Sequence, residues 1–293
     1  MTSSTLACRI SLMERAPLIT LTTDFGTADG YVGTMKGVIF GIVPNARLVD
    51  ISHEIAPQNL RQAAYVLYTA YLFFPPHTVH LVVVDPGVGS ARRPIALRTP
   101  AGDFVAPDNG VLSYVMAREP VEALVELADP RYRLPQVSHT FHGRDVFAPA
   151  AAHLATGVPV TSLGPPVPDP VTFPPPRLEI APDSVIGEVL HADRFGNVVT
   201  SIGQLDWSGG DLSLAPAFRG AEYGEPVRFN ADDAVVAVAG QEIAGVHRTY
   251  AEVTPGETLA LVGSEGHLEI AVREGSAAQR LGLRPGDGVV LRL

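Results

Sequence analysis

The chain has 293 residues, and its 31 acidic residues outnumber its 21 basic ones, which gives a formal net charge of −10. Nucleic-acid binding needs a cationic surface for phosphate contacts, so this balance argues against nucleic acid as a partner. The single cysteine, Cys8, excludes an intramolecular disulfide, and no apolar run approaches the roughly 20 residues of a membrane span. We therefore expect a cytoplasmic protein that does not contact a membrane.

The first 158 residues alternate between strand and helix patterns. We expect residues 1–17 to be a disordered lead-in, because they lack the pattern of a signal sequence. Predicted strands cover residues 18–23, 47–51 and 79–84, and predicted helices cover residues 30–43, 60–74 and 145–156. The order strand–helix–strand–helix–strand predicts a doubly wound α/β domain over residues 18–158, with a mostly parallel sheet.

The composition changes after this domain. Residues 159–176 contain eight prolines, a density incompatible with helix or central sheet, so we expect a proline-rich linker over residues 159–183. Short alternating runs follow at 184–190, 198–202, 226–229, 234–239, 258–262, 268–272 and 289–293. This pattern predicts a smaller all-β, barrel-like C-terminal domain over residues 184–293.

Two carboxylates follow predicted strands of the first domain. Asp24 ends the first strand and Asp85 ends the third. In open α/β sheets, ligands bind at the carboxyl ends of the strands, where an ionised Asp can accept hydrogen bonds from a ribose diol or contact an ammonium group. The nearby Asp29 is explained equally well as a helix N-cap. A tight turn is the alternative interpretation of the glycine-rich residues 85–90.

Three further loops allow either a structural or a functional interpretation. His142 in F-H-G-R-D can be a neutral donor or base, or a solvent-facing residue ahead of a helix start. D-R-F-G-N at 193–197 and G-S-E-G at 263–266 are good turn sequences in their own right. The scattered Asp and His residues lack the spacing of a known metal motif, so we expect no metal.

Six motifs, taken in chain order, resemble one known family. They are T-D-F-G…D-G-Y-V-G-T-M-K-G, V-D-P-G-V-G-S, A-P-D-N-G, F-H-G-R-D-V-F-A-P-A-A, D-R-F-G-N and G-S-E-G-x-L-E-I-A-V. Over residues 18–293 the chain resembles the adenosine-forming S-adenosyl-L-methionine (SAM) hydrolases, relatives of fluorinase and chlorinase. The resemblance implies hydrolysis of SAM to adenosine and L-methionine with neither metal nor cofactor. It also implies a homotrimer that binds its ligand between neighbouring subunits.

The resemblance implies a role for each matching residue. Asp85, Arg92 and His142 match the catalytic set linked to the attacking water or hydroxide, although the adjacent Arg93 leaves the choice of arginine open. Asp24 matches the residue that holds the ribose hydroxyls. The other matching substrate-binding positions are Phe141 and Tyr250 against the nucleoside, Asn197 at adenine, Asp193 and Ser264 near the methionine group, and Gly143, Glu265 and Val272.

Several positions bear on which reaction the chain performs. Fluorinase-type enzymes have Tyr where this chain has Asp85 and His142, and Ser where it has Gly143, which favours hydrolysis over halide transfer. Arg273 stands where many relatives have an Asn near adenine, and Glu265 where the halogenases have Arg, so adenine selectivity and the methionine carboxylate contact stay open. The alternatives are a SAM-dependent halogenase, a non-catalytic SAM or adenosine sensor, and a metal phosphoesterase.

Overall fold

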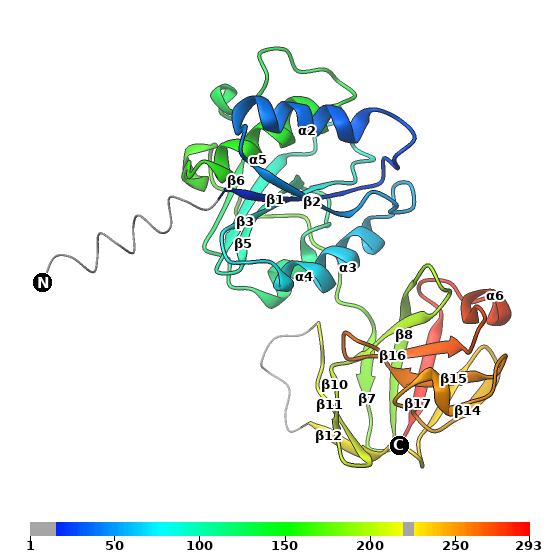
Figure 1. Ribbon diagram of the computed structural model, residues 1–293. Coiled ribbons are helices and arrows are strands. Elements are labelled where there is room, and N and C mark those ends of the chain that lie inside the picture. Colours follow the sequence, from blue (N-terminus) through cyan, green and yellow to red (C-terminus); the bar gives the residue numbers. More distant parts are fainter. Residues whose placement is uncertain (1–15, 219–225) are drawn as a thin grey trace, which may run out of the picture. The chain divides into compact units, whose positions relative to one another are not determined.

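The computed structural model describes residues 16–218 and 226–293, and the chain forms two compact units, Met1–Phe173 and Pro174–Leu293 (Figure 1). The expected disordered lead-in lies outside the described residues up to residue 15. In the part of the chain that is described, no helix has both the length and the apolar character needed to cross a bilayer.

The first unit is a six-stranded mixed sheet with helices on both faces (Figure 1). Its strands are β1 (Leu18–Thr23), β2 (Arg47–Ser52), β3 (Thr78–Val83), β4 (Pro94–Thr99), β5 (Gly102–Pro107) and β6 (Ala123–Glu126). Its helices are α2 (Tyr31–Ile42), α3 (Leu60–Ala70), α4 (Ser113–Arg118) and α5 (Ala148–Ala155), with short turns η1 (Tyr71–Phe73), η2 (Pro130–Tyr132), η3 (Gly143–Phe147) and η4 (Val160–Ser162).

The strand order is β2-β1-β3-β5-β4-β6, in which β2, β1, β3 and β5 run parallel and β4 is antiparallel to both its neighbours. Helices α2 and α5 cover one face of the sheet, and α3 and α4 cover the other (Figure 1). This arrangement confirms the predicted α/β domain with a mostly parallel sheet. Strands β4, β5 and β6 extend it beyond the three strands expected from the sequence.

Small side chains on α5 determine how closely the helices pack. Ala148, Ala150, Ala151 and Ala152 are all buried, in one core with apolar side chains of α2, β1 and β3. Because alanine adds little bulk, α5 lies close to both α2 and the sheet. The segment that leads into α5, which carries His142, is thereby fixed against the core.

The second unit is all β apart from short helices. Its strands are β7 (Leu178–Ile180), β8 (Ser184–Ala192), β9 (Val198–Gly203), β10 (Leu205–Ser208), β11 (Asp211–Leu214), β12 (Val227–Asn230), β13 (Val235–Val238), β14 (Gln241–Ala244), β15 (Thr258–Val262), β16 (His267–Val272) and β17 (Gly288–Arg292). The short helices are η5 (Tyr250–Glu252) and α6 (Ala277–Leu281). An eight-stranded antiparallel sheet in the order β14-β13-β17-β8-β9-β16-β15, with β7 on β8, curls into a nearly closed barrel, and β10, β11 and β12 form a small sheet. The barrel-like domain predicted from the alternating runs is confirmed.

The proline-rich segment differs from the extended linker expected over residues 159–183. Residues 159–173 belong to the first unit, where Glu126 donates its backbone N–H to Pro165 O at 2.9 Å and Val167 N–H donates to Leu124 O at 2.9 Å. Proline lacks a donor but keeps its carbonyl, so a proline-rich strand can still accept hydrogen bonds at a sheet edge. Strand β7 then pairs with β8 in the second unit.

Candidate active site

Asp24 and Asp85 lie at the carboxyl ends of neighbouring strands in the first unit's sheet. Asp24 directly follows β1, Asp85 comes shortly after β3, and these two strands are parallel neighbours. Both carboxylates line a pocket of about 400 Å³, together with Phe25, Tyr31 and Gln58 among others. The Asp24 carboxylate accepts the backbone N–H of Gln58 at 2.8 Å. Its remaining acceptor positions can serve a ligand in the pocket.

Asp85, Arg92 and His142 form one hydrogen-bonded cluster. Arg92 Nε donates to Asp85 Oδ1 at 2.8 Å, and Arg92 Nη2 donates both to Asp85 Oδ2 and to His142 Nδ1, the latter at 2.8 Å. The Arg92 side chain is 9% exposed and that of Asp85 6%. The guanidinium also lies 5.1 Å from the Phe147 ring centroid. A buried two-point ion pair of this kind holds the carboxylate in one orientation.

The same geometry assigns the protonation state of His142. A guanidinium has donors only, so His142 Nδ1 must accept and the ring proton sits on Nε2. Burial lowers the pKa of His142, and the positive charge of Arg92 lowers it further. The ring is therefore neutral at pH 7, and it presents an N–H donor rather than a basic nitrogen at Nε2.

A helical turn of the π type carries His142 at its start. Asp145, which is fully buried in this turn, accepts the Ser138 backbone N–H at 2.8 Å, and Ser138 Oγ accepts the Phe141 N–H at 3.0 Å. The loop of residues 138–142 is thus closed on itself. A Cβ added to Gly143 would lie 3.1 Å from Met35 Sδ and 3.2 Å from Phe141 Cε2, so even a small side chain here would press on its neighbours.

Phe141 belongs to a group of aromatic rings beside the carboxylates. Its ring centroid lies 5.1 Å from that of Tyr31 and 6.0 Å from that of Phe25, both edge-to-face. Phe25 and Tyr31 line the same pocket as Asp24 and Asp85. These rings give one wall of the pocket an apolar, π-rich surface.

Arg93, the neighbour of Arg92, forms its ion pairs with Asp108 and Asp169 instead of Asp85. It donates from Nε to Asp108 Oδ2 at 2.8 Å, and from Nη1 to Asp169 Oδ1 at 2.7 Å. Asp108 Oδ1 accepts the backbone N–H of Val171 at 2.8 Å. Arg93 therefore ties the proline-rich segment to the sheet, and Arg92 alone of the two contacts Asp85 and His142.

The second unit has its own pocket, of about 1000 Å³. Five of the expected substrate-binding residues line it: Asp193, Asn197, Tyr250, Ser264 and Val272. Glu265 is not among the lining residues, whereas Arg273 is. Arg273 Nη1 donates to Val253 O at 2.6 Å, which engages part of its guanidinium in the protein.

The D-R-F-G-N turn places Asn197 with one atom available to a ligand. Asp193 Oδ1 accepts the backbone N–H groups of Phe195 and Asn197, at 2.9 and 2.8 Å. Asn197 Nδ2 donates to Asp193 Oδ2 at 3.1 Å and to Tyr250 Oη at 3.2 Å. With both amide hydrogens used, Asn197 Oδ1 is the atom that can accept a hydrogen bond, for example from the exocyclic amine of a base.

Comparison with known proteins gives a match in each of the two units. Residues 19–164 match the family described as the SAM hydroxide adenosyltransferase N-terminal domain, and residues 187–290 match the corresponding C-terminal domain. The chain belongs to the SAM hydroxide adenosyltransferase family. An (R)-S-adenosyl-L-methionine hydrolase of Salinispora tropica is 42% identical over 279 residues, covering 94% of this chain and 97% of that protein. A fluorinase of Actinopolyspora mzabensis is 27% identical, over 93% of this chain and 96% of the fluorinase.

A solved structure shows the same fold for another sequence of this type. The crystal structure of an uncharacterized conserved protein from Thermotoga maritima superposes with a TM-score of 0.80 at 38% identity, over 93% of this chain and 99% of that one. Within the described ranges 16–218 and 226–293, no group of three or more His, Cys, Asp or Glu side chains is arranged to hold a metal ion.

One residue of the candidate site was missed by sequence reasoning, namely Glu269 on β16. It lines the second unit's pocket, and a Cβ on Gly263 would lie 1.9 Å from its Oε1, so any side chain at position 263 would displace this carboxyl group from the position it has here. Burial raises the pKa of Glu269 to about 7, with a further contribution from the Asp193 charge. The sequence signal was an acidic residue within the apolar strand pattern L-E-I-A-V.

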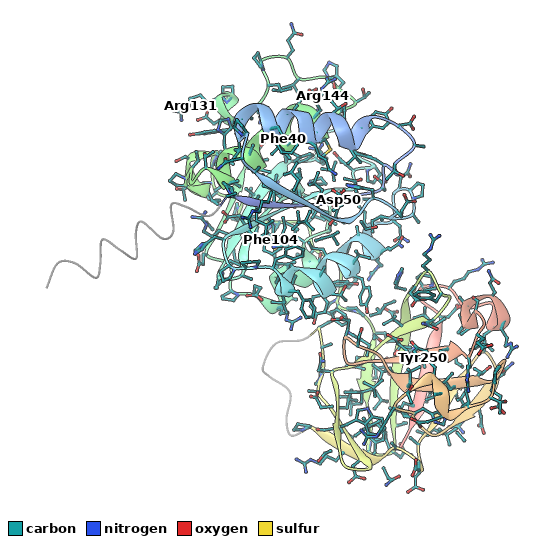
Figure 2. The ribbon with its side chains drawn as sticks, viewed as in Figure 1. Phe40, Asp50, Phe104, Arg131, Arg144 and Tyr250 are labelled. Atoms are coloured by element: carbon teal, nitrogen blue, oxygen red, sulfur yellow. The ribbon has the colours of Figure 1, made fainter. Side chains whose placement is uncertain are left out.

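Tyr250 shares this environment. Burial, together with the negative charges of Glu269 and Asp193, raises the pKa of its phenol, which therefore stays protonated at neutral pH and forms a hydrogen bond with Glu269. Figure 2 shows Tyr250 among the strands of the second unit. The pocket thus places two carboxyl groups near one phenol, an environment suited to a cationic group.

Proposed function

We propose that this protein hydrolyses (R)-S-adenosyl-L-methionine to adenosine and L-methionine by attack of water at the ribose C5′ atom. The observation that carries the proposal is the buried Asp85–Arg92–His142 cluster. It lies at the carboxyl ends of the strands, where Asp24 and Asp85 line one pocket. The family and the 42% identical SAM hydrolase support it.

The chemistry of the substrate explains why this cluster is sufficient. The leaving group is a neutral thioether, so the sulfonium needs no acid to depart. Water is a poor nucleophile, however, and must be held in line with the C5′–S bond in a site that excludes bulk solvent. The task therefore requires an acceptor for the water proton and a donor that orients the water oxygen.

Asp85 and His142 fill these two roles. The His142 Nε2–H donates to the water oxygen, and the Asp85 carboxylate accepts one of the water's protons. As the O–C5′ bond forms, the C5′–S bond breaks and its electron pair returns to sulfur, releasing methionine. The proton then passes from Asp85 to solvent. Arg92 is a positioning residue, because it orients Asp85 and fixes the His142 tautomer.

The remaining residues bind the substrate. Asp24 accepts from the ribose hydroxyls and Phe141 packs against the nucleoside, with Gly143 leaving room beside it. In the second unit, Asn197 Oδ1 accepts from the adenine amine. The other contacts in that unit come from Asp193, Tyr250, Ser264 and Val272, of which Asp193 and Ser264 bind the methionine group, whereas Glu265 lies outside the pocket lining and takes no part.

We further propose a cytoplasmic homotrimer in which neighbouring subunits share each substrate. The basis is that the water-activating cluster and the adenine-binding pocket belong to different units of the chain, and one SAM molecule must reach both. Light scattering should then give three times the chain mass. Mixing Asp85→Asn with Asn197→Ala chains should restore part of the activity that each lacks alone; a monomer without such complementation would overturn this assembly.

The test of the function is incubation with SAM in H₂¹⁸O, followed by chromatography and mass spectrometry. We expect equimolar adenosine and methionine, with ¹⁸O in the adenosine 5′-hydroxyl and undiminished turnover in the presence of a chelator. A halogenated nucleoside formed in chloride or fluoride would identify a halogenase. SAM or adenosine binding without methionine release would identify a sensor, and loss of turnover in chelator would point to metal chemistry.

Glu269 predicts a pH-dependent KM. Its pKa of about 7 means that the carboxylate forms as pH rises through neutrality, and a negative charge attracts the methionine ammonium. KM for SAM should therefore fall between pH 6 and pH 8. Glu269→Gln keeps the shape without the titration, so its KM should stay flat over this range and lie about tenfold above the wild-type value at pH 8. An unchanged pH profile in Glu269→Gln would remove this role.

A further inference from the structure

A chain of polar contacts links the surface of the first unit to the strand end that carries Asp24. Lys36 Nζ on α2 donates to Asp50 Oδ2 at 2.6 Å, and Asp50 Oδ1 lies 3.0 Å from Nε2 of His53. On the other side of the ring, His53 Nδ1 lies 2.8 Å from Thr23 Oγ1. His53 is 6% exposed and Thr23 is fully buried. Figure 2 shows Asp50 on β2, the strand that leads to His53.

Each contact has a defined direction. The Asp50 carboxylate can only accept, so the His53 nitrogen that faces it, Nε2, carries the proton of the neutral ring. His53 Nδ1 then accepts the Thr23 hydroxyl hydrogen, while Thr23 Oγ1 accepts the Phe25 backbone N–H at 3.3 Å. The contact between Nε2 and Asp50 is electrostatic, since Nε2 makes no well-aligned hydrogen bond within the described chain. Although partial burial opposes the effect, Lys36 and His53 hold the pKa of Asp50 below its usual value, so it is ionised at neutral pH.

The chain ends at the turn that presents Asp24. Besides the Thr23 contact, His53 accepts the Gly26 N–H on its backbone oxygen at 2.8 Å. Farther along the same loop, Gln58 donates its N–H to the Asp24 carboxylate at 2.8 Å, from a backbone with a φ of 66°. The β2–α3 loop is therefore fastened to residues 23, 24 and 26, and the position of Asp24 depends on it.

We propose that Thr23, His53, Asp50 and Lys36 form a positioning relay that holds Asp24 in its ribose-binding orientation. The inference rests on the proposed function in one respect, the ribose contact of Asp24. None of the four side chains needs to touch the substrate, because the relay acts through the backbone on either side of Asp24. Thr23 lies on β1, Asp50 on β2 and Lys36 on α2, and His53 follows β2 directly, so three of the four side chains stand on regular elements, which suits a support for a binding residue.

Thr23→Val is the decisive variant, because valine keeps the shape of threonine and removes only the hydroxyl. We expect adenosine binding to the full-length protein, measured by calorimetry, to weaken about tenfold, since the Phe25 backbone N–H and the buried His53 Nδ1 each lose their partner. Thr23→Ser should bind within about twofold of wild type. Thr22→Val is the matched control: Thr22 is also buried in β1, but its hydroxyl has no hydrogen-bond partner among the described residues.

A double-mutant cycle with Asp24→Ala separates positioning of Asp24 from a general structural effect. If the relay acts through Asp24, Thr23→Val weakens binding about tenfold in the wild type but less than about twofold in the Asp24→Ala background. Equal losses in both backgrounds overturn the relay while leaving the ribose contact intact, and so does a Thr23→Ser loss as large as that of Thr23→Val. Unchanged adenosine binding in Asp24→Ala alone instead overturns the ribose contact, and the relay with it.

Discussion

Asp85→Asn is expected to lower kcat for SAM hydrolysis by about 10²–10⁴-fold, the usual contribution of a general base. Asparagine keeps the size of the side chain and one acceptor oxygen, so the Arg92 contact survives in part. It cannot take a proton from water at neutral pH. KM for SAM should change much less than kcat, because the substitution removes an interaction with the attacking water and not with the bound substrate.

Asp103→Asn provides the matched control for this substitution. Asp103 is likewise a buried carboxylate in a two-point pair with an arginine, since Arg98 donates to Oδ1 and Oδ2 at 2.7 Å each. It lies near the start of β5, opposite Val79 at the start of β3, whereas Asp85 follows the end of β3, so the two carboxylates lie at opposite ends of the strands. Thermal unfolding of both variants separates loss of folding from loss of catalysis. A kcat in Asp85→Asn equal to that of Asp103→Asn would refute the base assignment.

The outline of the fold could be predicted because hydrophobic residues recur at regular spacing in the sequence wherever one face of a helix or strand is buried. The segment of β1 is rich in β-branched residues and that of β3 is largely apolar, and both β1 and β15 have the bounds predicted for them. Strands β4 and β5 were missed because their sequence is interrupted by polar residues such as Arg98 and Asp103, whose mutual pairing makes them acceptable within a sheet. Such cross-strand compensation depends on register, which local pattern does not contain.

The site shows the same limit at the level of single residues. The ordered motifs indicated which segments contribute to the site, and the structure shows which residue of each segment makes which contact. Gly263 illustrates this, because a Cβ there would overlap the carboxyl group of Glu269 on the facing strand, six residues further along the chain. His142 illustrates it again: its type allowed either a base or a donor, and only the Arg92 contact selects the donor at Nε2. Both properties arise from contacts between elements rather than from residue type.

The second large effect concerns the adjacent arginines, where the same Arg→Lys change is expected to lower kcat at position 92 and thermal stability at position 93. Arg92→Lys is expected to lower kcat about 10²-fold, because an ammonium cannot bind Asp85 at two points while also donating to His142. Without that donor at Nδ1, the His142 tautomer is no longer fixed, and the water loses its oriented N–H. The effect should fall on kcat more than on KM.

Arg93→Lys makes the same chemical change one residue along the chain. Arg93 binds Asp108, Asp169 and the proline-rich segment and touches neither Asp85 nor His142, so this variant should lower the midpoint of thermal unfolding while kcat stays within about twofold of wild type. Steady-state kinetics beside thermal unfolding of the two variants checks both halves of the prediction. The opposite pattern, with Arg93→Lys inactive and Arg92→Lys active, would move the positioning role to Arg93. Equal losses of kcat would show that the two-point contact between Arg92 and Asp85 is not specifically needed for catalysis, because any change in this loop would then lower kcat equally.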